Sequence, residues 1–258
     1  MDKTLISEND KRTIDAIEKY HLGIGRVADE KLTEAVCCYF VEQNPNVLQN
    51  IPSHKRTESV ILAAVNKNGS SIRFIDFEEQ TYKIAFAAVK NNPYSLQWIS
   101  RQFWTPELLN YATSHVGYTL KFILKSYQTY DLCLAAVNND GLALEFVSKK
   151  IVDSNLCEAA VQKDGKALNF VPNSLKTQEL CEKAVMKCGS ALQFVPNPFI
   201  NEDLCVSAVK NDGEALFFVP SSLLSDKIYK NIAHNCAKVL NILPKKYHNK
   251  KLCQLPTT

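Results

Sequence analysis

Apolar and polar positions repeat along this chain with a period of 24 residues. The stretch LCEAAVQKDGKALNFVPNSLKTQE, residues 156–179, is followed directly by LCEKAVMKCGSALQFVPNPFINED, residues 180–203. We number the registers of the repeat from 1 to 24, starting at Leu156. Register 1 is apolar in successive copies without an insertion or deletion: Val36, Val60, Ile84, Leu108, Leu132, Leu156, Leu180, Leu204, Ile228 and Leu252. So strict a period predicts a repeat architecture.

Register 22 predicts where a helix begins in each copy, because it always holds a residue suited to a helix N-cap. These residues are Asn9, Thr33, Thr57, Thr81, Thr105, Thr129, Asp153, Thr177, Asn201, Ser225 and Asn249. A helix of about ten residues should follow, with registers 1, 2, 5 and 6 as its buried face. Register 10 is glycine or proline from Pro45 to Gly213. We expect glycine there to end the helix in the left-handed conformation.

A second, shorter helix is predicted after the glycine, as in KALNFVP from Lys166 to Pro172. It has room for one or two turns, α or 3₁₀, and a loop of about five residues leads to the next cap. A repeat of this size cannot bury its own apolar faces, so neighbours must stack. The predicted fold is therefore all-α, a curved, superhelical α-solenoid. We expect an N-terminal cap with a degenerate repeat at 1–32, nine repeats at 33–248 and an end segment at 249–258.

The motif AAV-x-x-DG-x-AL-x-F, at Ala135–Phe146 and Ala159–Phe170, resembles the helical repeats of the domain-of-unknown-function family four-one-one-six. The resemblance is best from Leu132 to Pro220, fair from Val60 to Ser100 and poor at both ends. Members of that family occur in intracellular bacteria and in large DNA viruses. The resemblance therefore implies an effector-like or viral protein that acts among host proteins, and it brings no catalytic residues. The Asn-Pro variants at Pro45 and Pro93 are also similar to the leucine-rich variant repeat, which alternates α- and 3₁₀-helices.

Composition and charge are those of an ordinary folded protein. The 258 residues are 46% hydrophobic and 22% charged, with a formal net charge of +3. A protein that binds nucleic acid by neutralising phosphates usually has a stronger basic excess. The sequence shows no signal peptide and no apolar run long enough to cross a membrane. We expect a cytoplasmic protein with reduced cysteines, or one delivered to or made in a host cytosol.

The residue types that usually carry chemistry do not form a recognisable active site. Six of the nine cysteines stand at register 2, where stacked helices would hold them about 8–10 Å apart, too far for one zinc ion. We interpret them as packing residues, and the five histidines as surface residues. No phosphate-binding, dinucleotide-binding or nucleophile-elbow motif is present. We therefore expect a protein that is not an enzyme and that has no cofactor and no metal site.

Candidate contacts with a partner come from positions that the repeat leaves variable. Registers 8 and 14 form polar ladders, either a binding surface or a solvated face. The consensus weakens between Asn92 and Tyr130, where both tryptophans lie. This region is either an aromatic and basic interface or a local variation in packing. The candidates are Tyr94, Trp104, Tyr118 and Lys121 as contacts, with Arg73, Gln97, Arg101 and His115 around them.

The function predicted from these features is that of a non-enzymatic scaffold that binds a protein partner along the solenoid. The resemblance adds a host or defence protein as the partner. The alternative is a helical-repeat protein that binds nucleic acid or a nucleotide through its lysine, arginine and asparagine ladders.

Overall fold

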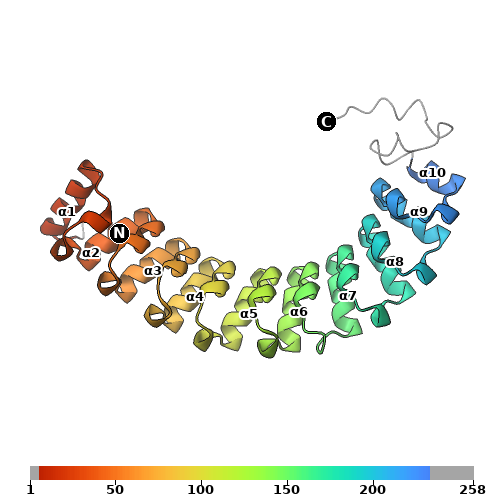
Figure 1. Cartoon of the computed structure of the whole chain (residues 1–258), viewed down its shortest axis with the longest axis horizontal. Helices are drawn as coiled ribbons and strands as arrows, with labels where there is room; N and C mark the ends of the chain where they lie inside the picture. The colour runs from red at the N-terminus through yellow and green to blue at the C-terminus, as the bar shows by residue number, and fades with distance from the viewer. Residues whose placement is uncertain (1–5, 233–258) are drawn as a thin grey trace, which may run out of the picture. The chain divides into compact units, whose positions relative to one another are not determined.

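The computed structural model describes residues 6–232, and within this range the chain is all-helical, as predicted. The chain forms two compact units, Met1–Phe122 and Ile123–Thr258. In each unit the helices stack side by side in the order of the sequence, as an α-solenoid array does (Figure 1). The N-terminal unit contains α1–α5 and the C-terminal unit contains α6–α10. The predicted end segment at 249–258 lies outside the described residues.

A typical repeat contains one α-helix and two 3₁₀-helices, although the repeat of α6 has only η12. The α-helices are α1 (Glu8–Lys19), α2 (Glu34–Gln43), α3 (Glu58–Lys67), α4 (Tyr82–Asn91), α5 (Pro106–His115), α6 (Tyr130–Asn139), α7 (Ser154–Lys163), α8 (Gln178–Lys187), α9 (Glu202–Asn211) and α10 (Asp226–Ile232). Six-residue 3₁₀-helices follow α2–α9: η4 (Pro45–Asn50), η6 (Gly69–Phe74), η8 (Pro93–Trp98), η10 (Gly117–Phe122), η12 (Gly141–Phe146), η13 (Gly165–Phe170), η15 (Gly189–Phe194) and η17 (Gly213–Phe218).

The predicted loop before each cap usually contains a further 3₁₀ turn of three residues. These turns are η2 (Ile24–Arg26), η3 (Asp29–Lys31), η5 (Ser53–Lys55), η7 (Phe77–Glu79), η9 (Arg101–Phe103), η11 (Lys125–Tyr127), η14 (Asn173–Leu175), η16 (Asn197–Phe199) and η18 (Ser221–Leu223). Several of them begin directly after a proline, such as Pro172 before η14, whose fixed backbone angle suits the entry into a tight turn. The predicted short second helix is thus 3₁₀, and it is followed by another turn.

The predicted caps begin every helix from α2 to α10. The Thr177 hydroxyl, for example, accepts a hydrogen bond of 3.2 Å from the N–H of Leu180, and the Asp153 carboxylate accepts one of 2.8 Å from Leu156. The prediction fails at α1, where Ser7 is the cap and Asn9 lies inside the first turn. Helix α1 starts two residues early because the Ser7 hydroxyl satisfies the N–H of Asp10 at 3.1 Å.

Glycine at register 10 has a different role from the predicted one. No glycine among residues 6–232 has a positive φ, so none ends a helix in the left-handed conformation. The α-helix ends two residues before the glycine, its C-cap is usually an Asn or Asp with an extended backbone, and the glycine starts the 3₁₀-helix. At Asp164 the side chain accepts a hydrogen bond of 2.8 Å from the N–H of Lys166. The missing side chain makes room for the next repeat: a Cβ on Gly165 would lie 2.3 Å from the carbonyl oxygen of Ala184.

The core of the array consists of the registers that the pattern predicts. Registers 1, 2 and 6 of α2–α9 are buried throughout, as are register 13 and most of register 16. The cysteines at register 2 belong to this core, since Cys37, Cys133, Cys157, Cys181 and Cys205 are all fully buried. Within each unit the α-helices pack against their neighbours, and α3–α5 and α7–α9 also pack against the six-residue 3₁₀-helices on both sides. Stability therefore comes from contacts between adjacent repeats.

Polar side chains at register 21 tie one repeat to the next. The Gln80 amide donates to the Trp98 carbonyl at 2.8 Å and accepts from the Ser100 N–H at 2.9 Å. Gln128 makes the same pair of bonds to Phe146 and Ser148, at 2.9 Å and 2.8 Å. Both glutamine side chains are buried, and their amides satisfy partly buried backbone groups of the next repeat.

A second tie joins the caps. The Thr33 hydroxyl, which caps α2, also donates to the Asp10 carboxylate of the previous repeat at 2.7 Å. Ser225 donates to Glu202 in the same way at 2.6 Å. One hydroxyl thus serves its own helix and the neighbouring one.

Candidate functional site

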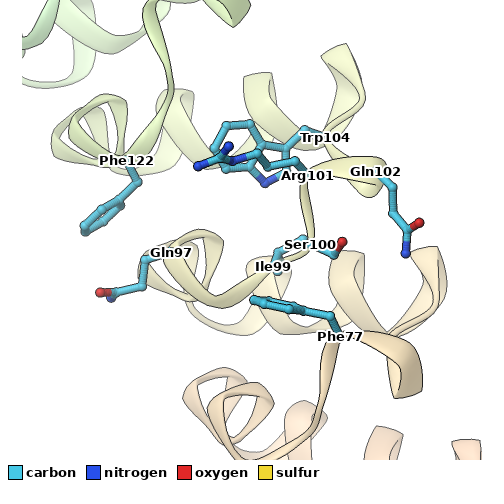
Figure 2. A pocket seen from close by; sticks show the side chains of 8 residues that line it. All are labelled: Phe77, Gln97, Ile99, Ser100, Arg101, Gln102, Trp104 and Phe122. Carbon is cyan, nitrogen blue, oxygen red and sulfur yellow. The ribbon is translucent and has the colours of Figure 1, made fainter.

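One concave surface of the N-terminal unit lies among three of its repeats. It is a groove of about 480 Å³, which we call the aromatic groove (Figure 2). Its lining comes from η7, from η8 and η9 with their connection, and from the end of η10: Phe77, Gln97, Ile99, Ser100, Arg101, Gln102, Trp104 and Phe122. Three aromatic rings, one cation and two side-chain amides therefore face one surface, and Arg101 is the only ionisable group of the lining.

Phe77 is the most exposed of the three aromatic rings. It is 59% exposed although it is a large apolar side chain. It opens the turn η7, which is anchored by Glu79: the Glu79 carboxylate accepts from the Asp76 N–H at 2.9 Å and lies 3.3 Å from the Arg56 guanidinium. Other described repeats have serine, arginine, lysine or asparagine at this register, for example Ser53 and Ser221. An exposed aromatic ring on a rigid turn is typical of a contact surface.

Trp104 stands at register 21, where other repeats have the buried glutamines Gln80 and Gln128. It follows η9 and is half-buried, so one part of the indole packs into the array while another part lines the groove. Figure 2 shows the indole and the Arg101 side chain on one side of Ile99 and Ser100, with the Phe77 ring on the other. Where Gln80 and Gln128 make hydrogen bonds to the next repeat, Trp104 therefore presents an apolar ring to the groove.

The structure brings three of the eight candidate residues together in the groove: Gln97, Arg101 and Trp104. Tyr94 is 41% exposed and is linked to Gln97, whose side-chain amide donates to the Tyr94 carbonyl at 3.0 Å. These four residues thus lie close together, and their role as an interface stays a prediction.

The other four candidates make local contacts outside the lining of the groove. The Lys121 ammonium lies 5.2 Å from the centre of the Tyr118 ring and donates to its hydroxyl at 3.0 Å. The Arg73 guanidinium lies over the ring of its neighbour Phe74, 4.5 Å from the centre. His115 is exposed and stacks on Tyr111, with the ring centres 4.0 Å apart.

Phe77 and Phe122 are groove residues that the sequence reasoning missed. Phe122 stands at register 15, where phenylalanine is the rule, so its register predicts only a core residue. Phe77 could have been found, because it is the one aromatic residue at its register among the described repeats. Phe77 lies outside the region of weakest consensus, in a repeat that otherwise matches the pattern well.

The polar ladder at register 8 is partly structural. The Asn91 amide donates to the Asn66 carbonyl at 2.8 Å and accepts from the Gly69 N–H at 2.7 Å. Asn211 donates to the Met186 carbonyl at 2.6 Å in the same way. These asparagines join adjacent repeats, so at these two positions the ladder is used for packing.

The comparisons with known proteins concern another part of the chain. Residues 153–200 match the family model described as Domain of unknown function (DUF4116). This segment is a DUF4116 match. It confirms the resemblance that the repeat motif indicated. No curated protein and no solved structure matches the chain.

The DUF4116 match has structurally clear limits. It begins at the cap Asp153 and ends just before the cap Asn201, so it spans two complete repeats of the C-terminal unit. Its residues carry the packing and capping pattern of α7 and α8. The aromatic groove lies outside the match, and the match therefore assigns nothing to the groove.

The register-2 cysteines, in the DUF4116 segment and in other described repeats, are held in the core. Burial raises the pKa of Cys157, and likewise the pKa values of Cys37 and Cys133, to about 11. A thiol with so high a pKa is a poor nucleophile at neutral pH. These observations support the interpretation of register 2 as a packing position.

Two further findings apply to residues 6–232. No group of three or more His, Cys, Asp or Glu side chains in this range is arranged to hold a metal ion. No helix in the same range has both the length and the apolar character needed to cross a membrane. His234, His248, Cys236 and Cys253 lie outside the described residues.

Proposed function

We propose that this chain is a non-enzymatic binding protein that holds an exposed segment of a partner protein in the aromatic groove. The observation that carries the proposal is the convergence of Phe77, Trp104 and Phe122 on one groove. Large aromatic side chains next to an arginine are the residue types that dominate the energy of protein interfaces. A groove of about 480 Å³ is large enough to receive one or two apolar side chains of a partner.

The polar groups of the groove suit a peptide better than a nucleic acid. Gln97 and Gln102 can each donate and accept, as peptide N–H and C=O groups require. Arg101 is the only cation in the lining, whereas binding of nucleic acid depends on several phosphate contacts. The same lining offers no pair of ionisable groups for acid–base catalysis, which supports a binding role.

The kind of partner is a further part of this proposal. A host or defence protein follows from the family resemblance alone, as does an effector-like or viral origin. The aromatic groove does not depend on that origin, because its lining would select an apolar and hydrogen-bonding segment in any setting.

The test uses substitutions that the array already contains at the same registers. Phe77→Ser takes the residue of Ser53, and Trp104→Gln takes that of Gln80, so the folded array should accept both. The control is Phe217→Gln, which removes a 62% exposed ring from the C-terminal unit and takes the residue of Gln193. The wild type, the double variant Phe77→Ser/Trp104→Gln and the control each serve as bait in a cell lysate. The captured proteins are quantified by mass spectrometry.

A partner of the groove should be captured by the wild type and by the control, and lost with the double variant. Alanine at Tyr94, Tyr118 and Lys121 then shows whether the contact extends beyond the groove. The proposal is wrong if the double variant retains every protein that the wild type captures. A gel shift with RNA and DNA at about 50 mM salt tests the alternative, since phosphate contacts are strongest at low salt.

A further inference from the structure

A second concave surface is formed by residues 9–31, at the first helix of the N-terminal unit. It is a cleft of about 340 Å³ between α1 and the connection that carries η2 and η3. One wall is a single face of α1, and the other is the connection: Asn9, Arg12, Thr13, Ala16 and Ile17 face Leu22, Arg26, Val27, Ala28 and Lys31. The residues from α1 have the spacing of one helical face, so they line the cleft together.

The repeat register shows what is unusual about this face of α1. The bond between Asp10 and Thr33 spans 23 residues, as does the bond between Glu58 and Thr81, so both pairs occupy the same registers. Arg12 and Thr13 therefore stand at registers 1 and 2. In α2–α9 these registers are apolar and buried without exception. In α1 the same face is polar and open.

A polar outer face is expected at the first helix of an array, because it keeps the end of the array hydrated. That requirement explains Arg12 and Thr13. It does not explain why Arg26 and Lys31, from another element, face the same cleft with no carboxylate in the lining. A face that only needs hydration would carry both signs of charge.

The cations of the cleft have no acidic partner among the described residues. Arg12, Arg26 and Lys31 are exposed, and no carboxylate within residues 6–232 forms an ion pair with any of them. Neighbouring carboxylates are engaged elsewhere. Asp10 accepts from Ser7 and Thr33, Asp29 lies 2.7 Å from His54 and 3.2 Å from Lys55, and Glu8 pairs with Lys11.

The floor of the cleft is apolar. Ile17 is buried, Val27 is half-buried, and Leu22 is 44% exposed although it is a large aliphatic side chain. A free inorganic anion would use the cations but not this floor. A ligand with an apolar group between two negative charges would contact both the cations and the apolar floor of the cleft.

We propose that this cleft, the basic cleft, binds a short acidic peptide segment that carries an apolar side chain between carboxylates. The apolar side chain lies on Leu22 and Val27, and the flanking carboxylates accept hydrogen bonds from Arg12, Arg26 and Lys31. Asn9 and Thr13 supply hydrogen bonds to the peptide backbone. The basic cleft shares no residue with the aromatic groove, so the proposed peptide binding in the cleft does not depend on the proposed function of the groove.

The experiment measures binding of labelled pentapeptides to the full chain by fluorescence anisotropy. The probe is Glu-Glu-Leu-Glu-Glu, compared with Gln-Gln-Leu-Gln-Gln and Glu-Glu-Ser-Glu-Glu. The variant combines Arg12→Gln, Arg26→Gln and Lys31→Gln. Its matched control combines Lys149→Gln, Lys150→Gln and Lys166→Gln, which removes the same charge from exposed positions of the C-terminal unit.

The acidic leucine peptide should bind more tightly than either comparison peptide. Neutralising the basic cleft should weaken this binding about tenfold, and the control should leave it unchanged. Binding should also weaken as salt rises. Equal losses in the variant and in the control would show a mere effect of net charge and overturn the proposal. Tighter binding of inorganic phosphate or of anionic phospholipid vesicles would overturn it as well.

A second measurement needs no variant and therefore does not depend on how the triple substitution folds. The leucine of the probe is replaced by photoleucine, and the cross-linked wild-type protein is mapped by mass spectrometry. Cross-links within residues 9–31 support the site. Cross-links confined to any other segment, or none at saturating peptide, contradict it.

Discussion

Replacing Gly165 by alanine tests whether register 10 is glycine because of close packing. A Cβ at this position would lie 2.3 Å from the Ala184 carbonyl oxygen, 3.0 Å from the Cys188 Cβ and 3.1 Å from the Cys188 nitrogen. An ordinary contact between carbon and oxygen is roughly 1 Å longer than the first of these distances. The obstacle is helical backbone, since the same Ala184 carbonyl accepts from the Cys188 N–H at 2.9 Å. It cannot turn aside as the end of a side chain could.

The cost follows from two opposing terms. Overpacking of a tight interface costs about 1–3 kcal/mol, and a rigid backbone neighbour favours the upper part of that range. Loss of glycine from the unfolded chain returns about 0.4–1 kcal/mol. No backbone strain is added, because φ at Gly165 lies outside the left-handed region. We expect Gly165→Ala to lower the free energy of unfolding by about 2 kcal/mol.

The matched control is Gly23→Ala. A Cβ there meets nothing within 4 Å, so this variant should be as stable as the wild type or slightly more stable. Pro45 and Pro93 occupy register 10 in two other repeats. The fold therefore accepts a Cβ at this register where the neighbouring repeat leaves room for it. The loss in Gly165→Ala should therefore be local.

Two assays separate a local loss from a global one. Urea unfolding followed by circular dichroism gives the midpoint, and hydrogen exchange read by mass spectrometry gives the location. Peptides from η13 and α8 should exchange faster in Gly165→Ala, while those from α2–α4 stay as they are. A midpoint equal to that of Gly23→Ala would refute the close-packing explanation, and so would faster exchange spread evenly over the chain.

Four further predictions follow from the ties, the core and the surface charges. Gln80→Ala should lower the free energy of unfolding, measured in urea, by about 1–2 kcal/mol, because it leaves a partly buried carbonyl and a partly buried N–H without their protein partner. Ser95→Ala should raise it by about 1 kcal/mol, because the Ser95 hydroxyl is buried without a hydrogen bond in the described structure. Cys157, with its pKa raised to about 11, should react with iodoacetamide at pH 8 only when denaturant is added, as mass spectrometry can follow. The hydrogen bond with His54, and to a smaller extent Lys55, lowers the pKa of Asp29 in the folded protein. The ionised carboxylate therefore stabilises the fold above the unfolded pKa, and this stabilisation is lost as the pH falls through the folded pKa. The difference in unfolding midpoint between wild type and Asp29→Asn should thus begin to shrink below about pH 4 and vanish once the pH is below the folded pKa.

Each of these predictions has a result that would contradict it. The prediction for Gln80→Ala is contradicted if this variant lowers the free energy of unfolding no more than Gln43→Ala, which alters an exposed side chain. A destabilised Ser95→Ala would show that the hydroxyl has a useful partner. Labelling of native Cys157 at the rate of the denatured protein would show an accessible thiolate. A difference between wild type and Asp29→Asn that does not shrink as the pH falls below about 4 would exclude the carboxylate as its source.

The sequence predicts the array well because its folding signals are local and repeated. The caps at register 22 and the apolar registers each act within one repeat, so their chemistry can be recognised without knowing the neighbour. The role of Gly165 could not be predicted in the same way. Its reason lies in the backbone of the next repeat, and a helix that ends before glycine usually suggests the left-handed cap. The buried amides Gln80 and Gln128 were overlooked for a similar reason, since their partners are backbone groups of another repeat.

The candidate site was predicted only in part, for a different physical reason. A groove depends on which side chains of separate turns point to the same place, and sequence spacing does not give that direction. Trp104 was found because tryptophan is rare in the chain. Phe77 was missed because phenylalanine is common in it, although not at its register. The basic cleft was missed because Arg26 and Lys31 lie in the loosely matched first repeat, where the registers are hard to assign.

The hydrogen bonds between repeats have a consequence for how the chain folds. Those that link Asp10 to Thr33, Asn91 to Asn66 and Gln80 to Trp98 span between 18 and 25 residues of sequence. In a chain of 258 residues these separations are about 0.07–0.1 of the chain length, and the many short contacts inside helices lower the mean further, so the relative contact order is at the low end found for fast-folding helical proteins. A newly made repeat can dock as soon as its immediate predecessor is in place, without waiting for any distant part of the chain. The array can therefore fold progressively while it is being synthesised, and a fault in one repeat leaves those already docked intact.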